Sequence, residues 1–276
     1  MHLTASGIPN RSFIGLFILL AILIMSSPGV AVAGLEEGEA ALNRGDYASA
    51  LREFKPLAEK GDARAQASMG YLYFQGRGVQ QDSKEAAKWL KKAADQGNSY
   101  AQYYLGKMHA AGNGVRQDDK DAAMYYRLAA AGGSIDGCIA LGIALLSGKG
   151  VAKNEVEGAT WIRKAADQGH RRARGLLGKL YATGTGVAQD AKEAARYFRM
   201  AAEAGDPDAQ SSLGLAYLAG KGVDKDAVQA YFWFELAAMK GEPTAVATKD
   251  HVAKELTPEQ IAKAKKRAQE WKPIDR

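Results

Sequence analysis

Apolar and polar positions along this chain repeat with a fixed period. A glycine followed by a polar residue returns every 36 residues from Gly61 to Gly241. Each period holds two apolar stretches, which flank a G-x-G-V tetrapeptide such as Gly76–Val79, and the second stretch ends in an Ala-Ala pair. The stretches have the spacing of amphipathic helices rather than the strict alternation of strands. Each period therefore predicts a helix, a Gly-rich loop and a second helix.

Polar residues at the predicted helix starts belong to the types that cap helices. For the first helices we predict N-caps at Asp62, Asn98, Ser134 and Asp206, with Pro207 at the following position. For the second helices we predict capping boxes at Asp82/Glu85, Asp118/Asp121, Asn154/Glu157, Asp190/Glu193 and Asp226/Gln229. The first glycine of each G-x-G is expected in the left-handed conformation that ends a helix.

Small and large apolar residues recur where two helices would meet. Gly70 and its copies, with the pair Ala93-Ala94 and its copies, predict close approach of the helices. Pairs such as Trp89-Leu90 and Trp161-Ile162 are expected to fill the groove between them. One helix pair cannot bury both of its faces, so neighbouring pairs are expected to stack.

The repeated pattern reads A-x-x-x-L-G-x-x-Y-x-x-G-x-G-V…D…A…W…A-A-x-x-G, for example over Ala101–Gly133 and Ala209–Gly241. It resembles the Sel-like repeat (SLR) family, which is related to the tetratricopeptide repeats. The resemblance implies an all-α, right-handed α/α superhelical solenoid of 36-residue helix-loop-helix repeats. Five repeats are predicted at 61–96, 97–132, 133–168, 169–204 and 205–240. A tetratricopeptide-like helix pair is expected at 34–60, and capping helices at 241–276, the last of which starts at Thr257–Gln260.

The first 33 residues have the features of a secretory signal. Arg11 precedes an apolar run at Phe13–Met25, and Ala31–Ala33 offers a cleavage site with small residues. The run is too short to span a bilayer alone, so cleavage is favoured over an uncleaved anchor. We therefore expect a protein of the bacterial periplasm or the cell exterior, with no membrane span after cleavage.

Composition excludes several other classes of protein. The chain of 276 residues is 47% hydrophobic and 25% charged, with a net charge of +6 that is not gathered into a tail, so no nucleic-acid partner is expected. A single cysteine, Cys138, excludes a disulfide framework, and we expect it to be a buried, inert thiol. The histidines lack metal-ligand spacing, so neither a metal nor a cofactor is predicted.

The sequence offers no candidate catalytic group. Neither S-x-x-K nor G-x-S-x-G occurs, which leaves serine acylation without a nucleophile. The recurrent G-x-G lies between predicted helices rather than after a strand, and Gly148–Gly150 lacks the Ser or Thr of a phosphate loop. We therefore predict a protein that is not an enzyme.

The resemblance implies that the first helix of each pair lines the inner face of the superhelix. Residues two before, two after and five after the pattern leucine would then face a partner. From these positions and the basic first helix of the fourth repeat, we predict the partner-binding residues Tyr71, Phe74, Tyr103, Lys107, Ile139, Ile143, Leu146, Arg172, Lys179 and Leu215. Our hypothesis is an apolar and basic groove for an extended or helical protein segment that carries acidic residues.

One stripe in the third repeat leaves two alternatives open. Ile135, Ile139, Ile143 and Leu146 lie on one helical face, which is additional to the face that packs through Cys138. A helix that is apolar on two faces must be covered twice. Either the neighbouring repeats cover the stripe, or a ligand binds there.

We expect a non-catalytic interaction scaffold that binds a protein or peptide. The resemblance implies roles such as regulation of envelope signalling or of exopolysaccharide production. One alternative is a cell-wall or polysaccharide binder that uses Tyr71, Tyr100, Tyr103 and Tyr104; a β-lactam or cell-wall hydrolase is another. The basic residues Lys263–Arg267 are expected to form the solvated face of a cap rather than a site for an acidic partner.

Overall fold

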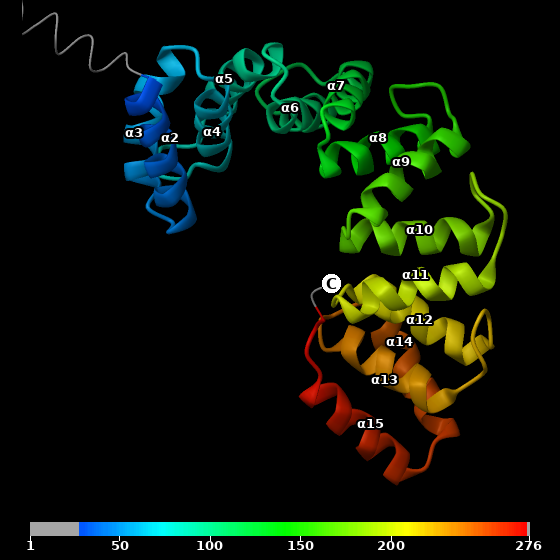
Figure 1. The fold of residues 1–276 in the computed structure, drawn as a ribbon. Helices are drawn as coiled ribbons and strands as arrows, with labels where there is room; N and C mark the ends of the chain where they lie inside the picture. The colour runs from blue at the N-terminus through cyan, green and yellow to red at the C-terminus, as the bar shows by residue number, and fades with distance from the viewer. Residues whose placement is uncertain (1–27, 275–276) are drawn as a thin grey trace, which may run out of the picture. The chain divides into compact units, whose positions relative to one another are not determined.

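The computed structural model describes residues 28–274, and every regular element in this range is helical (Figure 1). The predicted signal segment up to residue 27 lies outside the described residues. The chain divides into two compact units. The first holds the residues up to Met108 together with Asn113–Arg116, and the second holds His109–Gly112 together with Gln117 onward.

Helix pairs follow one another along the chain in both units. The first unit contains α2 (Pro28–Asn43), α3 (Tyr47–Glu59), α4 (Ala63–Gln75), α5 (Ser83–Asp95) and most of α6 (Ser99–Ala111). The second unit contains α7 (Asp119–Ala131), α8 (Ile135–Ser147), α9 (Glu155–Asp167), α10 (Arg171–Thr183), α11 (Ala191–Glu203), α12 (Pro207–Ala219), α13 (Ala227–Ala238), α14 (Pro243–Val252), the 3₁₀ turn η1 (Ala253–Glu255) and α15 (Pro258–Glu270). From α7 to α14, each helix packs on the next in chain order. The predicted all-α solenoid of stacked helix pairs is confirmed.

The N-terminal pair consists of α2 and α3. Helix α2 begins at Pro28, so its range includes the predicted cleavage site at Ala31–Ala33. Helix α3 begins after Asp46, whose carboxylate accepts a hydrogen bond from the Ser49 amide at 3.1 Å.

The predicted N-caps of the first helices are confirmed. The side chains of Asp62 and Asp206 accept hydrogen bonds from amides three residues later, at 2.8 and 2.9 Å, and Asn98 and Ser134 do the same. The fourth repeat has His170 at this position, and its Nδ1 accepts from the Ala173 amide at 3.4 Å. Histidine is not among the residues that sequence reasoning favours for a cap.

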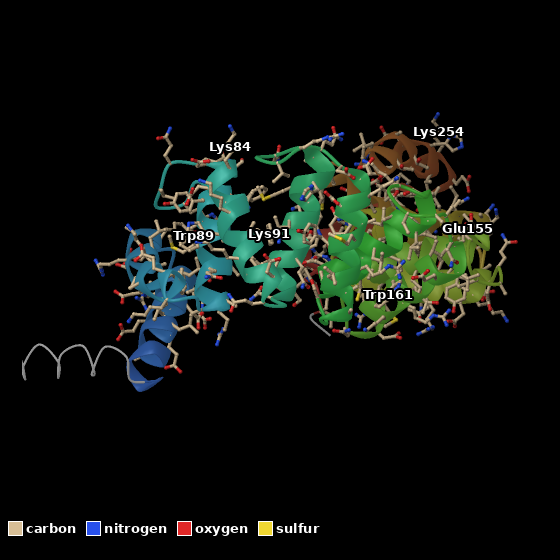
Figure 2. The ribbon with its side chains drawn as sticks, turned by 90° about the horizontal axis from the view of Figure 1, so that it is seen from above. Lys84, Trp89, Lys91, Glu155, Trp161 and Lys254 are labelled. Atoms are coloured by element: carbon tan, nitrogen blue, oxygen red, sulfur yellow. The ribbon has the colours of Figure 1, made fainter. Side chains whose placement is uncertain are left out.

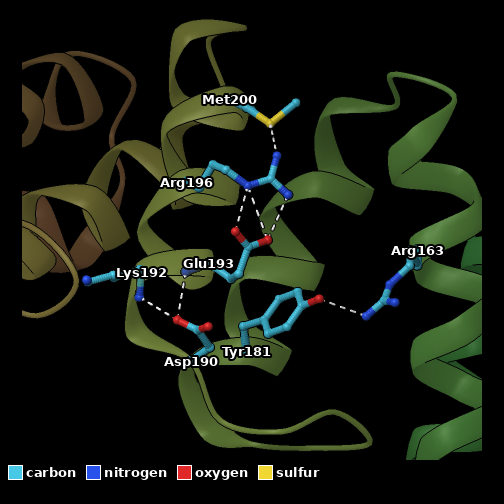
Figure 3. Close-up of polar contacts among 7 residues, drawn as sticks. All are labelled: Arg163, Tyr181, Asp190, Lys192, Glu193, Arg196 and Met200. Carbon is cyan, nitrogen blue, oxygen red and sulfur yellow. Dashed lines mark hydrogen bonds and ion pairs between the residues drawn. The ribbon is translucent and has the colours of Figure 1, made fainter.

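The capping boxes predicted for the second helices are only half present. Asp190 accepts from the amides of Lys192 and Glu193, as an N-cap should (Figure 3). The Glu193 carboxylate binds Arg196 at 2.8 Å instead of returning to the cap. The same exchange occurs where Glu85 binds Lys88. A complete capping box forms between Thr257 and Gln260, at the predicted start of α15: the side chain of each accepts a hydrogen bond from the backbone amide of the other.

Two glycines in each loop have different tasks, as the last repeat shows. Gly220 ends α12 at a φ of 65°, and its amide donates to the Ala216 carbonyl. Gly222 also has a positive φ, and a Cβ there would lie 1.8 Å from the carbonyl oxygen of Ala191. The second glycine therefore seats the loop against the start of the preceding repeat's second helix.

The predicted close approach of helices is confirmed inside the pairs α4/α5, α8/α9, α10/α11 and α12/α13. A Cβ on Gly178 of α10 would lie 2.6 Å from the Phe198 ring of α11, and a Cβ on Gly70 would lie equally near Leu90. Phe198 and Leu90 are buried, and these second members of the aromatic-aliphatic pairs fill the space between helices. In two repeats the first member of the pair lies nearer the surface: Trp89 and Trp161, labelled in Figure 2, are half-buried, and the ammonium of a lysine three residues later lies over each ring.

One position in the first helix of each repeat ties it to the preceding repeat. Gln66, Gln102 and Gln210 donate to the carbonyl oxygen eight residues earlier, at 3.0–3.2 Å. Arg174 makes the same bond to Ala166, and Cys138 directs its sulfur to Ala130 at 4.0 Å. These carbonyls lie near the end of the preceding second helix, where the intrahelical partners run out.

The C-terminal helices close the stack of the second unit. Ala264 and Ala268 of α15 are buried in one cluster with Val252 of α14 and with α13. The Ile274 amide donates to the Glu203 carbonyl at 2.8 Å, and the Lys240 ammonium donates to the Gly205 carbonyl at 2.7 Å. Of the basic residues on α15, Arg267 lies over the Phe232 ring, so it also packs the cap.

Candidate functional site

The predicted partner-binding residues differ in exposure according to their position relative to the pattern leucine. Two residues after the leucine, the side chains are accessible: Lys107, Ile143, Lys179 and Leu215 are exposed, and Tyr71 is half-buried. Two residues before it, Ile139 is only 4% exposed, and Ala67, Gly175 and Ser211 are buried as well. Phe74, Tyr103 and Leu146 are half-buried, and Arg172 is exposed. One of the three predicted positions therefore lies mostly inside the stack.

The apolar stripe of the third repeat is covered in part by its own neighbours. Ile139 belongs to the core around α8–α10, and Ile135 and Leu146 pack against that core. Ile143 remains 37% exposed. The stripe is therefore mainly self-buried, and one isoleucine is left at the surface.

Ile143 lies in a groove that we call the first groove. Its floor is α7, which contributes Ala122, Ala123 and Tyr126, and one wall is α8. Ala110, at the end of α6, lies opposite. The groove has a volume of about 250 Å³, and its charged lining residues are Asp119 and Lys149, whose carboxylate and ammonium lie 3.3 Å apart.

A second groove has the same construction 72 residues later. It is floored by α11 and walled by α10 and α12, and its volume is about 700 Å³. Leu215, which is 43% exposed, takes the place of Ile143, and Phe198 takes the place of Tyr126. The remaining pairs of equivalent lining residues are Ala110/Ala182, Asp119/Ala191, Ala122/Ala194, Ala123/Ala195, Ala140/Ser212, Ala144/Ala216, Ser147/Ala219 and Lys149/Lys221.

The residue five after the pattern leucine decides whether a groove is open. We call this the filling position; it reads Phe74, Ala110, Leu146, Ala182 and Leu218. Alanine stands at the two open grooves. Between them, Leu146 lies over α9, where a Cβ on Gly158 would be 2.9 Å from the leucine Cγ. Phe74 packs its ring against Tyr104 at 5.8 Å, and Leu218 packs against the core of the second unit. Large and small residues thus alternate with a two-repeat period.

Sequence reasoning did not find this alternation, although the signal was present. The five residues at the filling position can be read directly from the repeats. Their meaning depends on which side chain faces the gap between successive first helices, and the period alone does not show this.

Basic residues lie beside the two grooves. Lysine occupies the middle of the G-x-G loop only in the repeats that border an open groove, as Lys149 and Lys221, whereas the other loops have Arg77, Asn113 and Thr185. Lys179 is exposed at the position of Ile143 and Leu215, on α10, which forms one wall of the second groove. The second groove has Ala191 where the first has Asp119, so Lys221 faces no carboxylate among the lining residues.

The four tyrosines that could suit a glycan pack on one another in the first unit. Tyr71, Tyr100, Tyr103 and Tyr104 form ring pairs with centroids 4.6–6.0 Å apart. The Lys107 ammonium lies over both Tyr103 and Tyr104. Edge-to-face pairing and a neighbouring cation are ordinary packing contacts of tyrosine. The cluster therefore has a structural explanation.

Tyrosines in the second unit join successive repeats. The Arg163 guanidinium of α9 donates to the Tyr181 hydroxyl of α10 at 2.8 Å (Figure 3), and Arg199 makes the same bond to Tyr217 at 2.7 Å. In the second repeat His109 replaces the tyrosine; its ring stacks on Tyr125, and its Nδ1 lies 3.6 Å from the Asp121 carboxylate.

The reactive side chains in the part of the chain that the structure describes include possible metal ligands and the thiol of Cys138. Within residues 28–274, no three His, Cys, Asp or Glu side chains lie together as metal ligands would. Cys138 is buried, as predicted, and burial raises the pKa of its thiol. A thiol held in its neutral form is a poor nucleophile.

No helix within 28–274 combines the length and apolar character that a bilayer crossing requires.

Comparison with known proteins identifies the repeat. A family model described as the Sel1 repeat matches residues 63–98, 99–134, 135–170, 172–206 and 207–242. A solved Sel1 repeat protein from Oxalobacter formigenes is 31% identical, with a TM-score of 0.75, over 86% of this chain and 96% of that one. The protective antigen c5321 of uropathogenic Escherichia coli, which has an SLR fold, is 26% identical over 87% of this chain and 68% of its own, with a TM-score of 0.42. Among curated proteins, no similar sequence was found.

Proposed function

Since this chain belongs to the Sel1 repeat family, whose members are generally non-catalytic scaffolds for protein interaction, we propose that it binds a segment of another protein through the face formed by its first helices. The proposal is carried by one observation: Ile143 and Leu215, at equivalent positions of the two grooves, are large apolar side chains that remain about two-fifths exposed. Apolar side chains in lined hollows are typical anchors of protein interfaces.

The surroundings of the grooves favour a partner with acidic residues. Lys149 and Lys221 border the grooves, and Lys179 and Arg172 are exposed on α10, which forms one wall of the second groove. Complementary charge speeds encounter and fixes register more than it adds affinity. The ligand class is therefore an apolar segment with acidic neighbours.

The location in the periplasm or outside the cell is part of the same proposal. It is supported by the arginine, apolar run and A-x-A site of the first 33 residues. The partner is then a protein of the envelope or the exterior, and regulation of envelope signalling or exopolysaccharide production is a role consistent with it. Cell fractionation with N-terminal sequencing tests the location: a chain that starts at Gly34 in the periplasmic or medium fraction is expected, and an intact cytoplasmic chain would contradict it.

Affinity capture after cross-linking in the source cell tests the binding face. Three forms are compared: the wild type, the groove variant Ile143→Glu/Leu215→Glu, and the control Met239→Glu/Val246→Glu, which places the same charges on exposed apolar residues outside the grooves. Circular dichroism first establishes equal helicity. The wild type and control should capture the same protein, and the groove variant should lose it. Equal capture by all three would refute this face as the binding site.

The glycan alternative is separated by a second assay. Purified peptidoglycan and exopolysaccharide are mixed with the wild type and with Tyr100→Ala, which removes the most exposed ring of the tyrosine cluster. The proposal expects no retention of either form. Retention that depends on Tyr100 would replace the protein partner with a sugar.

A further inference from the structure

The two open grooves are lined by residues at equivalent positions of the repeats, a correspondence that two independent binding sites would not require. Ten lining positions correspond one to one across 72 residues, and Leu146 covers α9, the helix between the two grooves. We propose that one extended acidic segment of the partner occupies both grooves at once, with an apolar anchor residue in each. This inference rests on the proposed function and specifies its ligand.

The chemistry of the lining defines each anchor. Alanines and one aromatic ring form most of each groove, with Ile143 or Leu215 on the wall. Such a surface takes a leucine-sized or phenylalanine-sized side chain and offers few hydrogen bonds to a polar one. The larger second groove accepts the larger anchor.

The lysines place acidic residues beside the anchors. Lys149 and Lys221 hold equivalent positions at the two grooves, and Lys179 lies on α10, which forms one wall of the second groove. Lys149 already has Asp119 at 3.3 Å, whereas alanine stands at the equivalent position of the second groove. An acidic residue of the ligand therefore gains more at Lys221 than at Lys149.

The stack sets the distance between the anchors. The two grooves are four helix spacings apart, from α7/α8 to α11/α12. At about 8–10 Å for each spacing, this path is at most about 40 Å. An extended chain covers it with at most about 12 residues, whereas a helix would need about 27. The extended form thus orders fewer residues on binding, which lowers the entropic cost.

The chain itself supplies the variants that test this inference. Ala110→Leu and Ala182→Leu put leucine at the filling position of each open groove, where the third and fifth repeats already have Leu146 and Leu218. Ala111→Leu, on an exposed neighbour, is the matched control. The probes are fluorescein-labelled synthetic peptides of Gly, Ser and Glu that carry two leucines 6, 9 or 12 residues apart, one leucine, or none. Binding to the full chain is measured by fluorescence anisotropy.

We expect the best two-leucine peptide to bind at least about 10-fold more tightly than the one-leucine peptide, because the second anchor binds intramolecularly. Filling either groove should reduce its affinity to the one-leucine level, and filling both should reduce it to the level of the peptide without leucine. Ala111→Leu should leave binding unchanged. The advantage should depend on the leucine spacing.

Three results would overturn the inference. The first is equal binding, or no binding, by one-leucine and two-leucine peptides. The second is an advantage that survives groove filling. The third is a wild-type dimer, detected by analytical ultracentrifugation, that is lost in Ala110→Leu/Ala182→Leu, because a second copy of this chain would then occupy the grooves. If these occur while Ile143→Glu/Leu215→Glu still loses the captured protein, the proposed function stands and only the two-anchor ligand fails.

Discussion

At the scale of single residues, one side chain in the first helix of each repeat donates a hydrogen bond to a carbonyl near the end of the preceding helix. Gln66, Gln102 and Gln210 bond to buried carbonyls of the preceding helix, and Cys138 and Arg174 stand at the same position. Each of these carbonyls also accepts a hydrogen bond from a backbone amide three residues later, such as the Gly205 amide on the Ala202 carbonyl, so the side chain adds a second hydrogen bond to the helix end. These residues are therefore explained by packing, and they are separate from the exposed side chains at the grooves.

Replacing Gln210 by alanine tests this assignment. The side chain is fully buried and donates to the Ala202 carbonyl at 3.1 Å, while the Gly205 amide also donates to that carbonyl. Loss of the side-chain bond should therefore lower the free energy of unfolding by about 0.5–1.5 kcal/mol, the net value of one hydrogen bond. Gln189→Ala is the control, because its amide makes the same kind of bond, to the Ala182 carbonyl, at an exposed site. Urea denaturation measures both. Equal losses of stability in the two variants would show that burial does not increase the contribution of the Gln210 hydrogen bond.

Tyr231 gives the cap of the second unit a pH dependence. Burial, reinforced by the nearby Glu235 carboxylate, raises its pKa to about 12, against about 10 in an unfolded chain. The folded state holds the phenolic proton more tightly, so the contribution is fully present below pH 10 and is lost as the pH rises from about 10 to 12. Free energies of unfolding measured over pH 8–12 should fall less steeply in Tyr231→Phe than in the wild type. Parallel curves would contradict the assignment.

At the scale of elements, the loop between the two helices of a repeat is also the contact to the preceding repeat. Its first glycine ends a helix, and its second lies against the backbone at the start of another. A left-handed residue and a close approach are two separate demands on glycine. The second glycine of the loop, for example Gly222, meets both demands.

Substitution of Gly222 and Gly241 by alanine separates the two demands. Their φ angles are 74° and 75°, but a Cβ on Gly222 would meet the Ala191 carbonyl, whereas nothing lies within 4 Å of one on Gly241. Gly241→Ala should cost about 1–2 kcal/mol of stability, for the left-handed conformation alone. Gly222→Ala should cost a further 1–3 kcal/mol or so, for the overlap. Thermal unfolding of both variants measures these losses of stability. Equal losses would contradict a separate contribution from the close approach at Gly222.

At the scale of the whole molecule, the fold follows from the period, whereas the grooves do not. The 36-residue spacing, the caps and the paired glycines predicted the helix pairs and their stacking. Exposure along a first helix depends instead on contacts from both neighbours. Ile139 and Ile143 are one helical turn apart and were predicted to share a face, yet one is buried and the other exposed. His170 as a cap and Leu146 as a filler likewise became visible only with their neighbours in place.

Methyl NMR during a titration with the two-leucine peptide of best spacing tests whether one extended segment occupies both grooves at once. The methyl groups of Ile143 and Leu215 report on the two grooves, and those of the fully buried Ile162 and Leu177 serve as internal controls. We expect the signals of Ile143 and Leu215 to shift together and to saturate at the same peptide concentration, while the control signals do not shift. Shifts at only one groove, or at neither, would contradict this prediction.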